Sequence, residues 1–164
     1  MPSERFSISM FADQLHEFII GRNLRSPDIL GCSMGGYVAT YLARKQPGAV
    51  GRIITLGTKW KWTPEIASRE VKMLDLVLNR TSKMMLDMGE HNPLSLSDLA
   101  EVKTHILICL GNGDTMVSRE ESEEVADALP NGSLQIVMNS EHPIEKEIGE
   151  LVEFVERFVG GGLE

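Results

Sequence analysis

Short apolar runs alternate with longer amphipathic segments along most of this chain. Four of the runs are almost continuously apolar, as in strands that are buried on both faces of a parallel sheet. Between them, apolar residues recur three and four positions apart, which predicts helices. This alternation is typical of an α/β fold with a mostly parallel sheet flanked by helices. The strands are expected over 29–32, 52–57, 105–111 and 134–138, and helical segments over 7–21, 34–45, 65–90, 118–129 and 143–159.

The alternation is interrupted between the second and third strands. Thr63 is expected to cap a helix whose first residue is Pro64, and the segment 65–90 is expected to form one or two helices. Residues 91–97 are expected to form a loop, because the Asn-Pro pair there breaks regular structure. We therefore expect a short helical insert over 63–98 within a single domain that covers 1–164, a length that suits one domain.

Composition narrows the range of partners. The net charge of −8 argues against nucleic acid or an anionic membrane surface as the main partner. No apolar run approaches the ~20 residues of a membrane span, and no signal peptide opens the chain. Cys32 and Cys109 fall on strands expected to be separated by one other strand, so their Cα atoms would lie about 10 Å apart, too far for a disulfide. Free thiols suit a reducing compartment, so we expect a cytoplasmic protein.

Residues 31–35 are Gly-Cys-Ser-Met-Gly, which fits the G-x-S-x-G pattern of a nucleophile elbow. A short apolar run precedes the serine and a helix-like stretch follows it, as the sharp strand-to-helix turn requires. Glycines beside Ser33 remove Cβ atoms that would collide in so tight a turn, and Gly36 adds a further glycine. The N–H of Met34 would be one donor of an oxyanion hole at the start of the helix. The alternative is an ordinary strand–turn–helix junction with a serine at the turn.

Two further residues complete a catalytic set. In a parallel sheet, sites form at the carboxyl ends of the strands, and Asp114 and His142 follow the third and fourth strands. His142 would take the proton of Ser33, and Asp114 would orient the imidazole. Taken alone, Asp114 would be interpreted as a turn residue, and His142 as a surface or helix-capping residue. The order of Ser33, Asp114 and His142 along the chain favours a catalytic triad instead. The remaining histidines fit less well: His16, His91 and His105.

Several other side chains have two interpretations. Trp60 and Trp62 could line a substrate pocket or attach the insert to the body of the domain. Four methionines could form a soft apolar wall for an acyl chain or ordinary core. The acidic run 120–124 is expected to be a solvated face, in a helix opened by a capping box from Ser118 to Glu121. The methionines are Met73, Met84, Met85 and Met88.

No His/Cys cluster has the spacing of a metal site, and no glycine-rich phosphate loop is present. We therefore expect neither a metal nor another cofactor.

Together, the segments 31–36, 110–114 and 141–143 resemble the α/β-hydrolase superfamily. The resemblance covers nearly the whole chain, and it places the insert where that family has its cap or lid. It implies hydrolysis of carboxylic esters, thioesters, amides or small acyl compounds without a cofactor, with Ser33, His142 and Asp114 as the triad. The leading hypothesis is a serine hydrolase that cleaves a small ester through an acyl-enzyme.

The chain departs from the family pattern at its start, where the first strands are absent. The strand at 29–32 would then be a sheet edge, which leads us to expect a homodimer through that edge, a local rearrangement, or a fragment of a longer protein. The loop that supplies the second oxyanion donor would also be missing. One alternative is therefore a truncated, weak or inactive hydrolase-fold protein that binds a ligand or a partner. Another keeps the triad but transfers the acyl group to an acceptor other than water.

Overall fold

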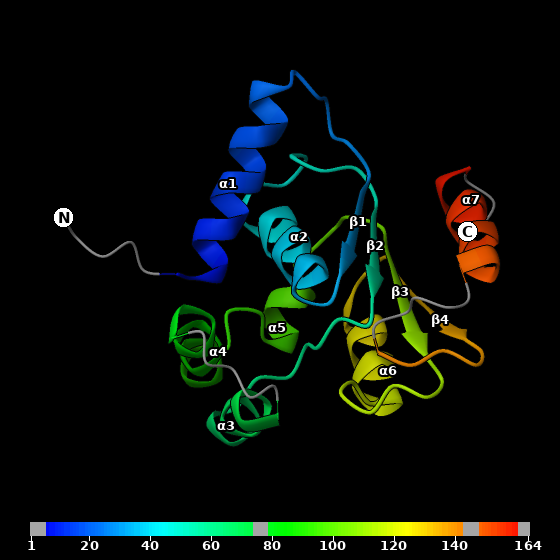
Figure 1. Cartoon of the computed structure of the whole chain (residues 1–164). Helices are drawn as coiled ribbons and strands as arrows, with labels where there is room; N and C mark the ends of the chain where they lie inside the picture. Colours follow the sequence, from blue (N-terminus) through cyan, green and yellow to red (C-terminus); the bar gives the residue numbers. More distant parts are fainter. Residues whose placement is uncertain (1–5, 74–78, 143–147, 161–164) are drawn as a thin grey trace.

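A four-stranded parallel sheet forms the centre of the computed structural model, which describes residues 6–73, 79–142 and 148–160 (Figure 1). The strands lie in the order β1-β2-β3-β4, so their order in the sheet follows the sequence. The strands are β1 (Ile29–Cys32), β2 (Ile53–Leu56), β3 (Ile106–Gly111) and β4 (Gly132–Val137). The helices are α1 (Ile8–Gly21), α2 (Met34–Lys45), α3 (Pro64–Met73), α4 (Asn79–His91), α5 (Leu96–Leu99), α6 (Arg119–Ala128) and α7 (Ile148–Val159).

Helices cover both faces of the sheet, as predicted (Figure 1). Side chains alternate between the two faces along each strand. Ile53 and Ile106 point into a core that they share with α1, α2 and α6, whereas Ile54 and Leu107 pack against α7 on the other face. The central strands β2 and β3 are thus buried on both sides, which explains why their sequences are continuously apolar.

The strand that leads into Ser33 lies at one edge of the sheet. β1 pairs with β2, and no strand within the described residues lies against its outer side. Leu30, at the middle of this edge, is 54% exposed. Cys32 on β1 and Cys109 on β3 are separated by β2, the arrangement that the sequence predicted, and no disulfide joins them. None of the described helices is both long enough and apolar enough to span a bilayer.

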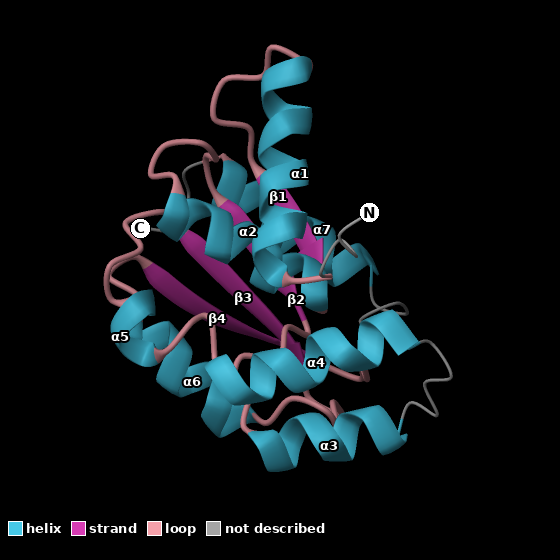
Figure 2. Ribbon diagram, turned by 90° about the vertical axis from the view of Figure 1, so that its left-hand side faces the viewer, coloured by secondary structure: helices cyan, strands magenta, loops and turns pink. Residues whose placement is uncertain are grey.

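The insert lies beyond the carboxyl ends of the strands, where α3 and α4 pack side by side (Figures 1 and 2). Thr63 caps α3, since its hydroxyl accepts a hydrogen bond from Ile66 N at 3.3 Å. The methionines at 84, 85 and 88 are buried in the main core, as their second interpretation proposed, whereas Met73 is exposed. Trp60 and Trp62 belong to the same core.

The structure corrects several predicted boundaries. The end of the loop predicted over 91–97 and the two residues after it form the short helix α5, which begins at a capping box made by Ser95 and Asp98. β4 begins at Gly132 rather than at 134. The described part of the last helix begins at Ile148; the residues 143–147, where its start was predicted, lie outside the described residues.

Glu121 contradicts the prediction of a solvated acidic face. The other glutamates of the run, Glu120, Glu123 and Glu124, are exposed, but Glu121 itself is only 6% exposed. The capping box is also half formed: Ser118 accepts a hydrogen bond from Glu121 N, while the Glu121 carboxylate accepts hydrogen bonds from Trp60 N and Lys61 N, both at 2.6 Å. Two backbone donors from a distant loop therefore replace the local partner that the sequence pattern predicts.

Candidate active site

Ser33 occupies the turn between β1 and α2 in a conformation that few side chains adopt. Its φ and ψ are 50° and −118°. A positive φ is strained for a residue other than glycine, and such strain is concentrated at functional sites. The turn is held in place from β2, because Ser33 N donates to Leu56 O at 2.8 Å and the Thr58 hydroxyl donates to Ser33 O at 2.9 Å.

The glycines around Ser33 are not equivalent. A Cβ on Gly31 would lie 2.5 Å from Gly36 N, and a Cβ on Gly36 would lie 2.8 Å from Thr55 Cβ, so neither position accepts a side chain without a shift of the backbone or of a packed neighbour. A Cβ on Gly35 would meet no atom within 4 Å. The steric demand expected of the flanking glycines therefore falls on Gly31 and Gly36, and not on Gly35.

Met34 is the first residue of α2, which places its N–H directly after Ser33. The first N–H groups of a helix have no partner inside the helix, and they favour negative charge nearby. The position of Met34 is therefore compatible with a donor to an oxyanion.

Asp114 and His142 meet at the carboxyl edge of the sheet. His142 Nδ1 lies 2.9 Å from Asp114 Oδ2, and the two side chains are 12% and 0% exposed. The second carboxylate oxygen, Oδ1, accepts hydrogen bonds from Met116 N at 2.8 Å and from Val117 N at 2.9 Å. With Nδ1 directed at the carboxylate, the other ring nitrogen of His142 is left to act on a substrate or a nucleophile.

The surroundings of Asp114 favour its ionised form. Burial by itself raises the pKa of this carboxyl, but hydrogen bonds from His142 and from the N–H groups of Val117 and Met116 outweigh it, and the pKa lies below its ordinary value. The carboxylate is therefore charged at neutral pH, as required of a group that orients an imidazole and stabilises its protonated form.

Gly57, the residue that follows β2, lies against the pair and was not singled out from the sequence. Its φ is +56°, and a Cβ placed on it would lie 2.9 Å from His142 Nδ1 and 3.2 Å from Asp114 Oδ2. The signal that could have identified it is a glycine at the carboxyl end of a buried strand, between two strands that carry candidate residues. Gly57 and Leu56 thus connect the elbow of Ser33 to the Asp114–His142 pair.

The structure brings Asp114 and His142 into contact over Gly57. Ser33 is held by a hydrogen bond to Leu56, the residue that precedes Gly57. No hydrogen bond joins the Ser33 hydroxyl to His142 within the residues that the structure describes. Catalytic hydrogen bonds are often long in proteins without substrate and shorten when substrate binds, so the lack of this bond is compatible with a nucleophilic serine. Pro143, which follows His142 in the motif, lies outside the described residues.

The remaining candidates lie elsewhere. The ring centroid of Trp60 lies 6.1 Å from that of Tyr37, with the two rings tilted, and Trp62 Nε1 donates to Lys59 O at 3.2 Å. Both tryptophans are packed in the core. This position fits attachment of the insert to the body of the domain better than the lining of a substrate pocket. His91 is an exposed residue of α4, and His105 precedes β3 at the amino edge of the sheet. Among residues 6–73, 79–142 and 148–160, no three His, Cys, Asp or Glu side chains are placed to hold a metal ion.

Comparison with known proteins identifies the fold. No protein-family profile and no curated protein matches the sequence. Solved structures do resemble it, among them an α/β hydrolase enzyme from a sediment metagenome of the Mar Chica lagoon in Morocco, with a TM-score of 0.76 and 22% identity over 98% of this chain and 74% of that one. A thermophilic esterase from Thermogutta terrifontis gives a TM-score of 0.75 and 19% identity over 97% of this chain and 74% of the other.

A third similar structure is named as a predicted CIB-like hydrolase from Thermoplasma acidophilum, with a TM-score of 0.70, 20% identity and coverage of 95% of this chain and 61% of that chain. The chain thus spans between three fifths and three quarters of the length of these three proteins. At such identities the likeness shows the fold alone, and the chain has the α/β-hydrolase fold, as its motifs predicted.

Proposed function

We propose that this α/β-hydrolase-fold chain is a serine hydrolase that cleaves a small carboxylic ester or a related acyl compound. The observation that carries the proposal is the buried Asp114–His142 pair at 2.9 Å, which lies over Gly57 beside the strained elbow of Ser33. The hydrolases among the similar structures support the same reaction class. No cofactor takes part in the proposed reaction.

In the proposed mechanism, Ser33 Oγ attacks the carbonyl carbon while His142 Nε2 takes the hydroxyl proton. Asp114 fixes the imidazole through Nδ1 and stabilises its charged form. The negative charge of the tetrahedral intermediate develops on the former carbonyl oxygen, next to the N–H of Met34. The C–O bond to the alcohol then breaks, His142 returns the proton to the leaving oxygen, and an acyl-enzyme remains on Ser33. Water, activated by His142, hydrolyses it in the reverse sequence of proton transfers.

With Met34 as the single assigned oxyanion donor, the reaction is expected to be slow. Loss of one such donor typically costs a factor of about 10²–10³ in rate. Two other functions remain to be tested against this one: acyl transfer to an acceptor other than water, and binding of a ligand or partner by an inactive hydrolase fold.

The first experiment compares turnover of a short-chain nitrophenyl ester by the wild type and by Ser33→Ala and His142→Ala. We expect both variants to fall to background, whereas His91→Ala, a substitution on the exposed surface of α4, keeps the wild-type rate. Labelling with a fluorophosphonate should modify the wild type and not Ser33→Ala. A wild type that neither turns over the ester nor takes the label would favour the binding function. A competing alcohol that diverts the acyl group separates transfer from hydrolysis.

Two further parts of the proposal concern the setting of the protein. The two cysteines, Cys32 and Cys109, form no disulfide with each other, which supports a reducing, cytoplasmic location. The open edge of β1, with Leu30 exposed, supports pairing with a second copy of the chain. Light scattering of the purified chain tests this pairing, and a monomer at high concentration would exclude it.

A further inference from the structure

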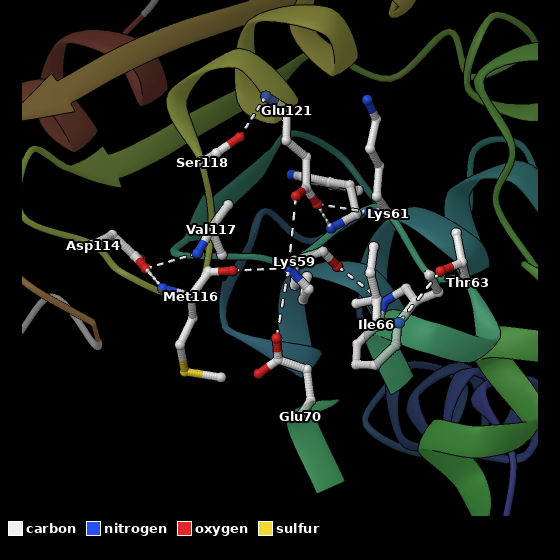
Figure 3. Close-up of polar contacts among 12 residues, drawn as sticks. Lys59, Lys61, Thr63, Ile66, Glu70, Asp114, Met116, Val117, Ser118 and Glu121 are labelled. Carbon is white, nitrogen blue, oxygen red and sulfur yellow. Dashed lines mark hydrogen bonds and ion pairs between the residues drawn. The ribbon is translucent and has the colours of Figure 1, made fainter. Parts of the chain in front are cut away.

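A buried lysine lies where the loop after β2, the insert and the loop of Asp114 meet (Figure 3). Lys59 is 9% exposed, and its ammonium donates a hydrogen bond to Met116 O at 2.8 Å. The same nitrogen lies 3.7 Å from Glu121 Oε2 on α6 and 3.9 Å from Glu70 Oε1 on α3. One side chain thus joins the loop after β2 and the insert to the more distant segment that holds the Asp114 loop and α6.

Its two acidic partners explain why a charged lysine is tolerated at this depth. A buried ammonium is costly unless opposite charge and hydrogen-bond acceptors surround it. Glu121 is fixed by the N–H groups of Trp60 and Lys61, and Glu70, only 1% exposed, brings a second carboxylate from the insert. These partners hold the Lys59 ammonium in one place, where it remains directed at Met116 O.

The acceptor of Lys59 belongs to the peptide group that also holds Asp114, the carboxylate proposed to orient His142. Met116 O and Val117 N are the two ends of one planar peptide, and Val117 N donates to Asp114 Oδ1 at 2.9 Å. The carbonyl and the N–H of a trans peptide point in opposite directions, so Lys59 and Asp114 hold it from its two sides. A cation at the carbonyl oxygen also polarises the N–H and strengthens it as a donor.

We propose that Lys59 is a positioning residue for Asp114, acting through the Met116–Val117 peptide, and that Glu70 of the insert keeps the lysine in place. This inference rests on the proposed function for its effect on catalysis, but its structural part does not. Lys59 contacts neither the imidazole nor the candidate nucleophile in any hydrogen bond among the described residues. It acts by setting the position and the hydrogen bonds of the carboxylate that orients His142.

Amide hydrogen exchange at Val117 tests the structural part without any need for activity. We expect Lys59→Met to speed this exchange about 10- to 100-fold, because a hydrogen bond from a charged donor no longer holds the peptide. The exchange of core amides in β3, such as that of Ile108, should change much less, which separates local release from general destabilisation. Glu70→Gln keeps the shape of the side chain and should speed Val117 exchange about 2- to 5-fold, as expected for a weakened ion pair.

Lys61→Met is the matched control, since Lys61 is two residues away and its ammonium pairs with Glu124 at the surface. It should leave Val117 exchange at the wild-type rate. Glu70 also pairs with Arg69 at 2.8 Å, so Lys59→Met leaves Glu121 without its cation and Glu70 with one cation fewer. If this variant fails to fold, Lys59→Met combined with Glu70→Leu restores the wild-type net charge of the cluster and still deletes the hydrogen bond to Met116. Wild-type exchange at Val117 in the folded variant overturns the proposal, and wild-type exchange in Glu70→Gln overturns the role of Glu70.

Catalysis supplies a second readout. If the wild type hydrolyses the nitrophenyl ester, Lys59→Met should lower kcat about 10- to 100-fold with little change in KM, because the Asp114 carboxylate is misplaced while the substrate site is intact. An unchanged kcat overturns the catalytic part of the inference. A wild type without turnover contradicts the proposed function, and the exchange experiment then still decides whether Lys59 positions Asp114.

Discussion

Replacing Gly57 by alanine is the sharpest test of the site, because one methyl group is aimed at both members of the Asp114–His142 pair. The new Cβ would lie 2.9 Å from His142 Nδ1 and 3.2 Å from Asp114 Oδ2, where ordinary contacts begin at 3.4 Å. The methyl group forces the imidazole to move by several tenths of an ångström, away from a hydrogen bond that measures 2.9 Å. The φ of +56° adds backbone strain of about 1–2 kcal/mol for any residue with a side chain.

These two effects predict different losses. The strain lowers the free energy of unfolding by about 1–2 kcal/mol. The displaced imidazole lowers kcat/KM by about 10- to 100-fold, since a misplacement of about 1 Å costs on the order of 10²-fold. A change in the downfield NMR signal of the proton between His142 and Asp114 reports the displacement directly.

Gly48→Ala separates strain from crowding. Gly48 also has a positive φ, of +85°, but no atom lies within 4 Å of the place where its Cβ would be. This variant should lose a similar amount of stability and keep the wild-type kcat/KM. Stability is measured by urea unfolding and activity with the nitrophenyl ester, corrected for the folded fraction. Equal kcat/KM for Gly57→Ala and Gly48→Ala would refute the reasoning, because the position of the His142 imidazole against Asp114 would then not matter for turnover.

Three other predictions concern stability and reactivity. The pKa of Asp114 is lowered in the folded state, so its stabilising effect is present above the unfolded pKa of about 3.9 and is lost as the pH falls through the folded value. Urea unfolding should therefore show that the difference in the free energy of unfolding between the wild type and Asp114→Asn becomes smaller below about pH 4, and a difference that grows in acid contradicts this. Gly36→Ala should lower the free energy of unfolding by about 1–3 kcal/mol, because its Cβ meets Thr55 Cβ at 2.8 Å, and an unchanged melting temperature speaks against that contact. Burial raises the pKa of Cys109 to about 12, so a thiol reagent at pH 8 should modify Cys109 only when the chain unfolds, whereas equal rates for Cys109 and the exposed Cys32 would contradict its burial.

The parts that the sequence predicted well depend on local patterns. Apolar runs identify the four strands because both faces of a parallel sheet are buried, and the pattern around Ser33 identifies the elbow because a sharp turn needs small residues nearby. Asp114 and His142 could be paired because carboxyl ends of parallel strands share one edge. Their contact at 2.9 Å agrees with that reasoning, although their catalytic role stays a prediction.

The parts that it missed depend on contacts between distant segments. Glu121 fits a capping box equally well whether its carboxylate turns back to the helix or accepts from Trp60 and Lys61, and only the packing of the loop against α6 decides between them. Gly57 looks like an ordinary end of a strand until His142, which comes much later in the chain, is placed against it. Lys59 looks like a surface residue in a polar loop until Glu70 of the insert is placed 3.9 Å from its ammonium.

The strand order of the sheet also bears on the sequence in which the parts of the candidate site are assembled during synthesis. The four described strands are neighbours in the order in which they leave the ribosome. Each of them can therefore pair with the one before it, and none of the four has to be inserted between two others. Ser33 follows the first strand, and its elbow is held once β2 has docked. Asp114 arrives with the third strand and His142 only after the fourth. If Ser33 and His142 have the proposed roles, the nascent chain carries the nucleophile long before its base, and it is expected to remain chemically inert until β4 has paired.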